Sequence, residues 1–261
     1  MEVTILTDNH AGGRFGAEHG LSVWIKYHDF HLLMDTGHSS LFLDNAALLN
    51  IDVQAQTDAI VLSHGHWDHG DGLRHISGKP LYTHPLSFIK RFRQQDHSYI
   101  GLDLTEKEIN EQFALHVSAE PVEITEGLFF LGEVPRMLPF DMGETTFVDS
   151  SGAPDYVPDD SGVVAVVNGE LVVISGCAHA GICNTILHAQ RVTGISKIRA
   201  VMGGFHLKKD DVRLRSTIEW LKDQQVKQVM PSHCTELPAL AAFHTQFQSA
   251  QIKTGQTWQF D

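Results

Sequence analysis

Residues 63–72 read Ser63-His64-Gly65-His66-Trp67-Asp68-His69-Gly70-Asp71-Gly72 and directly follow the apolar run Ala59-Ile60-Val61-Leu62. Side chains alternate along an extended chain, so His64 and His66 point to one side, whereas Asp68 and His69 point elsewhere. Ligands divided in this way suit two ions about 3.5 to 4 Å apart, with an oxygen nucleophile between them, better than a single ion. The stretch therefore predicts a metal site at the carboxyl end of a strand, where open α/β sheets place their sites.

An alternative interpretation of the same residues is a polar surface turn whose histidines are solvated. It leaves unexplained why so many groups that are costly to bury lie beside an apolar strand. The metal interpretation accounts for ligand type, spacing and glycine placement together.

The composition limits the class of protein. With 261 residues and 42% hydrophobic content, the chain can bury a large core, and we expect a single domain over residues 1–261. A formal charge of −13, with only 19 Lys and Arg, argues against a broad nucleic-acid surface. No stretch approaches the roughly 20 apolar residues of a membrane span, and the N-terminal residues lack a signal-peptide pattern. We expect a cytoplasmic protein without a nucleic-acid or membrane partner, and its oligomeric state stays open.

The three cysteines, Cys177, Cys183 and Cys234, cannot all pair and form no Cys-x-x-Cys pattern. Reduced thiols are therefore expected. Cys177 and Cys234 lie close in sequence to histidines, but free cysteine is among the most buried residue types. We expect both to be small buried thiols rather than ligands.

The first half of the chain predicts a sheet followed by an insertion. Strand-like segments occur at residues 3–6, 21–27, 31–35, 59–63 and 80–84, with a helix from Ser39 or Ser40 to about Leu49. From residue 85 to about 116 the signals become polar and helical, and Thr105 to Glu108 match a capping box. We expect an inserted helical lid there. Residues 122–132 are strand-like again, and 135–160 form a long irregular stretch of a kind that is often functional.

The second half is more regular. Asn168-Gly169 joins two β-type runs, 162–167 and 170–175, and predicts a hairpin. Three strand-like segments then lead to His179, His206 and His233, separated by helical segments. Strands that alternate with helices and end in metal-capable side chains predict a layered α/β fold with its ligands at one edge.

These motifs resemble the metallo-β-lactamase fold superfamily, through the His-x-His-x-Asp-His core, the Asp35-Thr36-Gly37 turn and the late strand-end histidines. The resemblance covers essentially the whole chain and implies a four-layer αββα sandwich with a two-metal site at the edge of paired sheets. Other motifs are similar to a subgroup that contains archaeal 7,8-dihydropterin-6-methyl-4-(β-D-ribofuranosyl)aminobenzene 5′-phosphate synthases and bacterial metal-dependent hydrolases. They are Asp8-Asn9, Ala17-Glu18-His19-Gly20-Leu21, Gly132-Glu133-Val134-Pro135-Arg136, Gly176-Cys177-Ala178-His179-Ala180-Gly181, Gly203-Gly204-Phe205-His206-Leu207 and His233-Cys234-Thr235.

The resemblance implies a ligand set for each of two divalent ions. His64, His66 and His179 would hold the first ion, and Asp68, His69 and His233 would hold the second. Asp68 would also hold the nucleophile as the catalytic residue. Such ligands suit Zn²⁺, with Mn²⁺, Fe²⁺ and Mg²⁺ as alternatives. Asp35 and Asp8 are expected to orient the ligands through hydrogen bonds.

Other residues are candidates for substrate contact. His206, at a glycine-rich strand end, is expected to touch substrate, with a ligand or an anchor as alternatives. His84 is either a substrate contact or a structural histidine. Arg136 would contact an anion, because it belongs to a subgroup motif. The Lys90-Arg91-Phe92-Arg93 cluster is either a solvated helix face or a phosphate contact on the lid.

The chain departs from the superfamily pattern at one strand end. Many superfamily hydrolases carry a metal-bridging Asp in a Gly-Asp-Thr turn, whereas this chain reads Ser175-Gly176-Cys177-Ala178-His179. The resemblance therefore supplies no bridging carboxylate here.

Together these observations favour a dinuclear metal-dependent hydrolase that uses a metal-bound hydroxide on an ester or phosphoester-type small molecule. One alternative is a transferase of the dihydropterin-synthase kind, which joins a pterin diphosphate to a ribofuranosyl aminobenzene phosphate. The other is a non-catalytic metal-binding sensor.

Overall fold

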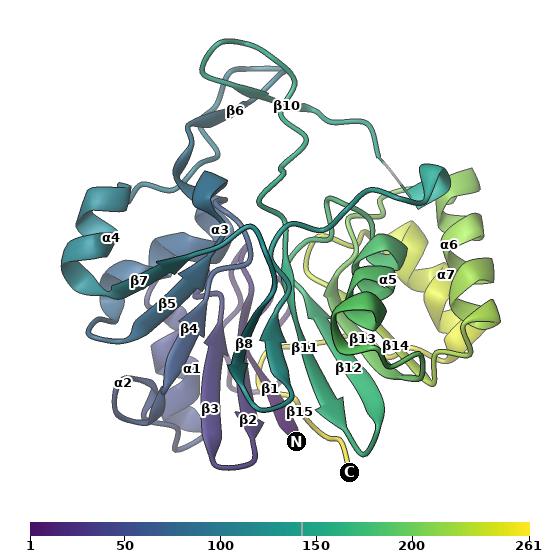
Figure 1. Cartoon of the computed structure of the whole chain (residues 1–261), viewed down its shortest axis with the longest axis horizontal. Helices are drawn as coiled ribbons and strands as arrows, with labels where there is room; N and C mark the ends of the chain where they lie inside the picture. Colours follow the sequence, from purple (N-terminus) through teal and green to yellow (C-terminus); the bar gives the residue numbers. More distant parts are fainter. Residues whose placement is uncertain (142) are drawn as a thin grey trace.

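The computed structural model describes residues 1–141 and 143–261, and within them two large sheets pack face to face (Figure 1). The first sheet has the order β15-β1-β2-β3-β4-β5-β7. Its strands are β1 (Glu2–Thr7), β2 (Ser22–Tyr27), β3 (Phe30–Met34), β4 (Ala59–Val61), β5 (Pro80–Thr83), β7 (Ala114–Val117) and β15 (Thr257–Gln259).

The second sheet has the order β14-β13-β12-β11-β9-β8. Its strands are β8 (Val122–Thr125), β9 (Leu128–Phe130), β11 (Gly162–Val167), β12 (Glu170–Ser175), β13 (Ile198–Gly204) and β14 (Gln228–Ser232). The hairpin between β11 and β12 is confirmed, and Asn168 and Gly169 both have positive φ, as its tight turn requires.

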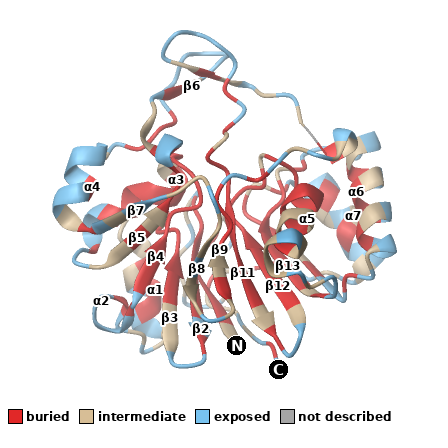
Figure 2. Cartoon of the chain, in the orientation of Figure 1, coloured by how far each residue is buried: buried red, intermediate tan, exposed pale blue. Residues whose placement is uncertain are grey.

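Helices cover the outer face of each sheet, so the four-layer αββα arrangement is confirmed (Figure 1). The first sheet carries α1 (Leu41–Leu48), α2 (Val53–Gln56) and α4 (Glu106–Gln112), and the second carries α5 (Ile182–Thr193), α6 (Val212–Asp223) and α7 (Leu237–Phe247). One apolar core lies between the sheets, and one lies under each helical layer. Figure 2 shows this as buried sheets flanked by helices with exposed outer faces.

The topology collects several strand ends at one rim. Strands β3, β4, β5 and β7 run parallel, and so do β12, β13 and β14, so each group sends its carboxyl ends to one edge. The chain termini lie at the opposite end of the sandwich (Figure 1). The loops at the rim therefore carry the histidine motifs.

The segment expected as a helical lid, residues 85–116, contains one α-helix, α4, which lies beside β7 at the edge of the first sheet. The part that projects beyond the sheets is strand β6 (Arg91–Arg93), which pairs antiparallel with β10 (Phe147–Asp149) (Figure 1). We call this pair the β6–β10 ribbon. The two strands of the ribbon lie far apart in the sequence, so the local composition of residues 85–116 could not predict their pairing.

A membrane-spanning helix, which would have to be both long and apolar, does not occur in the described ranges 1–141 and 143–261. The three cysteines are free, as expected.

Asp141 is a buried carboxyl whose Oδ2 accepts a hydrogen bond from the backbone N–H of Asn184 at 2.9 Å. Burial nevertheless raises its pKa from 3.8 to about 6. The folded state therefore retains a proton that the unfolded chain loses. The protonated carboxyl makes its full contribution to the free energy of unfolding below about pH 4, and this contribution is lost as the pH rises through about 6.

Asp141→Asn has no charge to bury. Its free energy of unfolding, relative to that of the native chain, is therefore expected to increase by about 3 kcal/mol as the pH rises from 4 to 7. Urea unfolding of both proteins across this range measures the difference. A difference that is independent of pH would contradict the assignment.

Candidate metal centre

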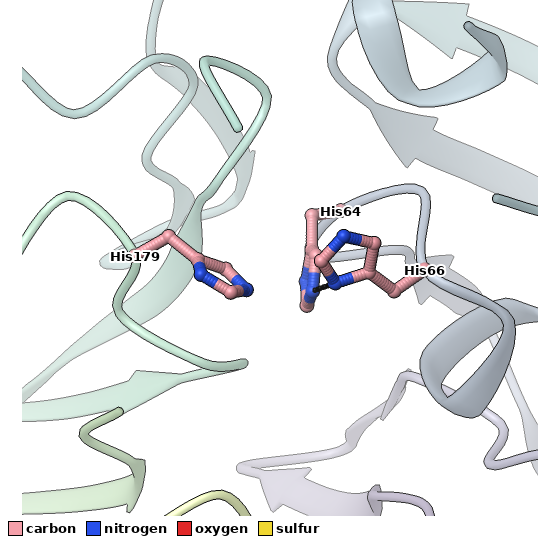
Figure 3. Close-up of side chains that lie close together, drawn as sticks. All are labelled: His64, His66 and His179. Atoms are coloured by element: carbon pink, nitrogen blue, oxygen red, sulfur yellow. Dashed lines mark hydrogen bonds between the residues drawn. The ribbon is translucent and has the colours of Figure 1, made fainter. Parts of the chain in front are cut away.

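The first group of metal-capable side chains combines the two halves of the chain. His64 and His66 follow β4, and His179 follows β12 in the other sheet. His64 Nε2 lies 2.9 Å from His66 Nδ1, and one nitrogen from each of the three rings lies within 4.8 Å of the others. Figure 3 shows His179 facing His64 and His66 across the gap between their loops.

The second group lies beside the first. Asp68 and His69 are in α3 (Trp67–Gly70), and His233 follows β14. His233 Nε2 lies 3.1 Å from His69 Nε2 and 3.4 Å from Asp68 Oδ2. The structure thus brings together all six residues that the sequence suggested as ligands, in two groups of three.

Hydrogen bonds to Nδ1 fix the ring orientation of His64 and His69. Asp35 Oδ2 is 2.7 Å from His69 Nδ1, and it accepts from the Ser63 hydroxyl, which in turn lies 2.9 Å from His64 Nδ1. Both Nδ1 atoms are therefore placed to donate, which leaves the Nε2 lone pairs facing forward. Asp35 lies where the sequence placed it, behind the ligands.

His233 has its own support. Its Nδ1 lies 3.0 Å from Asn9 Oδ1, and its backbone N–H donates to Asp8 Oδ2 at 3.2 Å. Asp8 thus holds the main chain of His233, and Asn9 sets the orientation of its ring. Both come from the chain after β1, a connection that only the folded sheet makes.

The backbone at these positions adopts conformations that non-glycine residues seldom use. Asp35, Ala178, His206 and His233 have φ values of 57°, 52°, 46° and 49°. Such left-handed residues persist where the surrounding structure holds them, and they cluster at functional sites. At His233, Asp8 Oδ2 accepts from the backbone N–H and Asn9 Nδ2 donates to the backbone oxygen, and these hydrogen bonds supply that support.

Burial and neighbouring charges set the protonation of these groups. Burial lowers the pKa of His64, His66 and His179 well below the usual range, so the three imidazoles are neutral and keep their lone pairs. Burial alone would raise the pKa of Asp68, but its histidine neighbours hold it well below its usual value. Burial would lower the pKa of His233, yet the hydrogen bond to Asp68 raises it to about 9.

The residues fit divalent ions. Nitrogens that share a tetrahedral zinc at about 2.0 Å lie about 3.3 Å apart, close to the 2.9 Å between His64 and His66 and the 3.1 Å between His69 and His233. His179 Nε2 is buried and has no hydrogen-bond partner among the described residues, a costly arrangement that a bound cation would relieve. Three imidazoles in one group, and two imidazoles with a carboxylate in the group beside it, have the composition of a dinuclear site.

A cavity of about 330 Å³ opens onto both groups. Its lining includes His66, Asp68, His179 and His233 from the two groups, and also Trp67, Phe147, Arg93 and Lys208. Phe147 belongs to the β6–β10 ribbon, and its ring centroid lies 5.1 Å from that of His66. The space suits a small molecule, and two cationic side chains border it.

Comparison with known proteins identifies the family. No family model matches the chain. An uncharacterized protein of Methanocaldococcus jannaschii is 34% identical over 248 residues, which cover 91% of this chain and 92% of that protein. The 7,8-dihydropterin-6-methyl-4-(β-D-ribofuranosyl)-aminobenzene-5′-phosphate synthase of the same organism is 32% identical over 270 residues, covering 95% and 92%. The crystal structure of a metal-dependent hydrolase of the β-lactamase superfamily has a TM-score of 0.88 and 29% identity, covering 100% of this chain and 99% of that one. The chain belongs to the metallo-β-lactamase superfamily.

Membership of the metallo-β-lactamase superfamily implies divalent metal binding, in agreement with the two groups at the rim. Among the remaining candidates, His206 lines the cavity, and its ring centroid lies 4.4 Å from that of His179. Its position permits the expected substrate contact, and it also lies near Cys177 and Cys234.

His84 and Arg136 lie outside the main cavity of this metallo-β-lactamase fold. His84 is buried, and its Nδ1 accepts from the backbone N–H of Leu86 at 3.1 Å. Arg136 donates to the backbone oxygens of Tyr156 and His179, and borders a small neighbouring cavity. The substrate contacts expected of His84 and Arg136 stay predictions.

The basic cluster at 90–93 divides between two roles. Arg91 is fully buried, with Nε 3.0 Å from Asp155 Oδ2 and Nη2 2.7 Å from Asp159 Oδ1. Asp159 also accepts from the backbone N–H of Gly65 at 2.7 Å, and so ties the ribbon to the metal loop. Arg93, by contrast, lines the cavity. Neither role is that of a solvated helix face.

His19 is a cavity residue that sequence reasoning did not single out. Its Nε2 lies 3.1 Å from Asp68 Oδ2, although about half of its side chain (53%) is exposed. It belongs to the Ala17–Leu21 motif, which resembles the corresponding motif of the subgroup. A histidine within a family motif was the available signal.

Proposed function

We propose that the chain is a dinuclear metal-dependent hydrolase of the metallo-β-lactamase superfamily, acting on an ester or phosphoester-type small molecule. The observation that carries the proposal is the meeting of two ligand groups, His64, His66 and His179 beside Asp68, His69 and His233, at a cavity that members of both groups line. Zinc is the ion best suited to this ligand set, with manganese or iron as alternatives.

Divalent ions bound here would polarise the scissile group and lower the pKa of a coordinated water. The protein's own residues would hold the ions and orient the reacting groups. Asp68, kept ionised by its neighbours, would hold its cation and orient the nucleophile. His19, which contacts both Asp68 Oδ2 and solvent, is placed to orient the Asp68 carboxylate.

Substrate recognition would come from the cationic rim. Arg93 on the ribbon and Lys208 after His206 line the cavity of a chain whose formal charge is −13. Cationic side chains placed at a cavity in an acidic protein favour a phosphorylated or otherwise anionic substrate. Phe147 would cover the reacting group from the ribbon and exclude water. We further propose that the ribbon acts as the lid and that the whole chain works as one domain.

The synthase relative, 32% identical over most of both chains, supports a second candidate. In that case the same site would join a pterin diphosphate to a ribofuranosyl aminobenzene phosphate and release diphosphate.

One experiment separates these functions. Protein purified without added ions is analysed for metal and then incubated with a panel of esters, phosphomonoesters and phosphodiesters, and separately with both synthase substrates. We expect bound divalent metal and turnover in the panel that chelation abolishes. Condensed product with released diphosphate, and no panel turnover, would support the transferase instead. Bound metal without turnover in either assay would contradict both and leave the sensor alternative.

A further inference from the structure

Cys177 occupies the space between the two groups of ligands. It follows β12, is 3% exposed, and places Sγ 3.2 Å from His69 Nε2. Its sulfur and one ring nitrogen each from His64 and His69 all lie within 4.8 Å of one another. Because His64 belongs to the first group and His69 to the second, the sulfur faces both.

The backbone holds the thiol in this position. A Cβ on Gly204 would lie 3.1 Å from Cys177 Cα and 2.6 Å from Cys234 Sγ, so a glycine there leaves room for both cysteines. Gly204 also donates its backbone N–H to Gly176 at 3.0 Å. The positive φ of Ala178 bends the chain between Cys177 and His179, and both line the cavity.

We propose that Cys177 Sγ is a thiolate ligand shared by the two cations. The inference rests on the proposed dinuclear centre and names the group that joins its halves. On loading, the S–H bond breaks, its proton passes to solvent, and the sulfur lone pairs form one bond to each ion, without oxidation or reduction. A thiolate favours zinc, iron or cobalt over magnesium, so Cys177 would also narrow the choice of metal.

Two other thiols provide controls. Cys183 is buried in α5 among apolar side chains of the helical layer, away from the ligand groups. The Cys234 sulfur lies within 4.8 Å of ligand atoms of Cys177 and His206, in a group that contains neither His64 nor His69. Replacing either one removes a thiol without removing the proposed ligand.

The test uses cobalt(II)-loaded full-length protein and its near-ultraviolet absorption. The native protein, Cys183→Ser and Cys234→Ser are expected to show thiolate-to-cobalt charge transfer, and Cys177→Ser is expected to lose it. Cys177→Asp, which offers an oxygen ligand, should also lose the band while it still binds two ions per chain. A band that survives Cys177→Ser, or one that disappears only in Cys234→Ser, would overturn the proposal.

X-ray absorption at the zinc edge of the native protein gives an answer that needs no variant. We expect a sulfur scatterer at about 2.3 Å in addition to nitrogen and oxygen at about 2.0 Å. Two bound zinc ions with only nitrogen and oxygen neighbours would refute the thiolate bridge and leave the dinuclear hydrolase in place. Failure to bind any divalent ion would refute both.

Discussion

His66→Ala is expected to lose most of the bound metal and nearly all turnover while the protein stays folded. His66 belongs to the first ligand group, and its buried Nδ1 lies 2.9 Å from His64 Nε2. Even the outer partners of metal ligands cost about 10- to 100-fold in metal affinity when they are removed, so loss of a ligand should cost more than about 100-fold. Asp68→Ala should behave in the same way, because it removes the carboxylate of the second group.

Metal content after dialysis, turnover of the substrate found in the screen, and thermal unfolding together measure this effect. His97→Ala, at an exposed histidine of the same chain, is the matched control and should match the native protein in all three. Undiminished metal in both His66→Ala and Asp68→Ala would rule out the site.

Arg91→Met is expected to destabilise the fold by about 3–5 kcal/mol. Removing one partner of a buried ion pair leaves uncompensated charge in the interior, and here both Asp155 and Asp159 would be stranded. Because Asp159 also holds the backbone N–H of Gly65, the damage should reach the metal loop and reduce metal retention.

Denaturant unfolding of the native protein and the variant measures the change. Arg215→Met is the matched control, since Arg215 pairs with Asp210 at the surface, where such pairs contribute about 0–1 kcal/mol. If the two methionine variants lost equal stability, the buried network would have no special role.

The core of the site could be predicted because its chemistry is local. The alternation after a buried strand places His64 and His66, and the Asn168-Gly169 turn fixes the hairpin that leads to His179. The pairing of His179 with His64, and of His233 with His69, came from the family resemblance. Residues more than a hundred positions apart in sequence have no local signal of their contact.

The remaining features depend on tertiary partners. In the sequence, Arg91 belongs to a basic cluster that is typical of a solvated surface. In the structure it is buried against Asp155 and Asp159, which come from the irregular stretch. Cys177 was expected to be a buried thiol, and it is buried, but only the folded structure shows that it lies beside His64 of the first ligand group and His69 of the second. The β6–β10 ribbon likewise exists only through pairing across 50 or so residues of chain.

Anomalous diffraction from crystals of the native protein, at the absorption edge of the metal it carries, tests the central claim most directly. We predict two peaks, one within about 2.0–2.3 Å of ligand atoms from His64, His66 and His179, and the other equally close to Asp68, His69 and His233. A metal-replete crystal whose peaks lie away from these six side chains, or in contact with only one of the two groups, would contradict it.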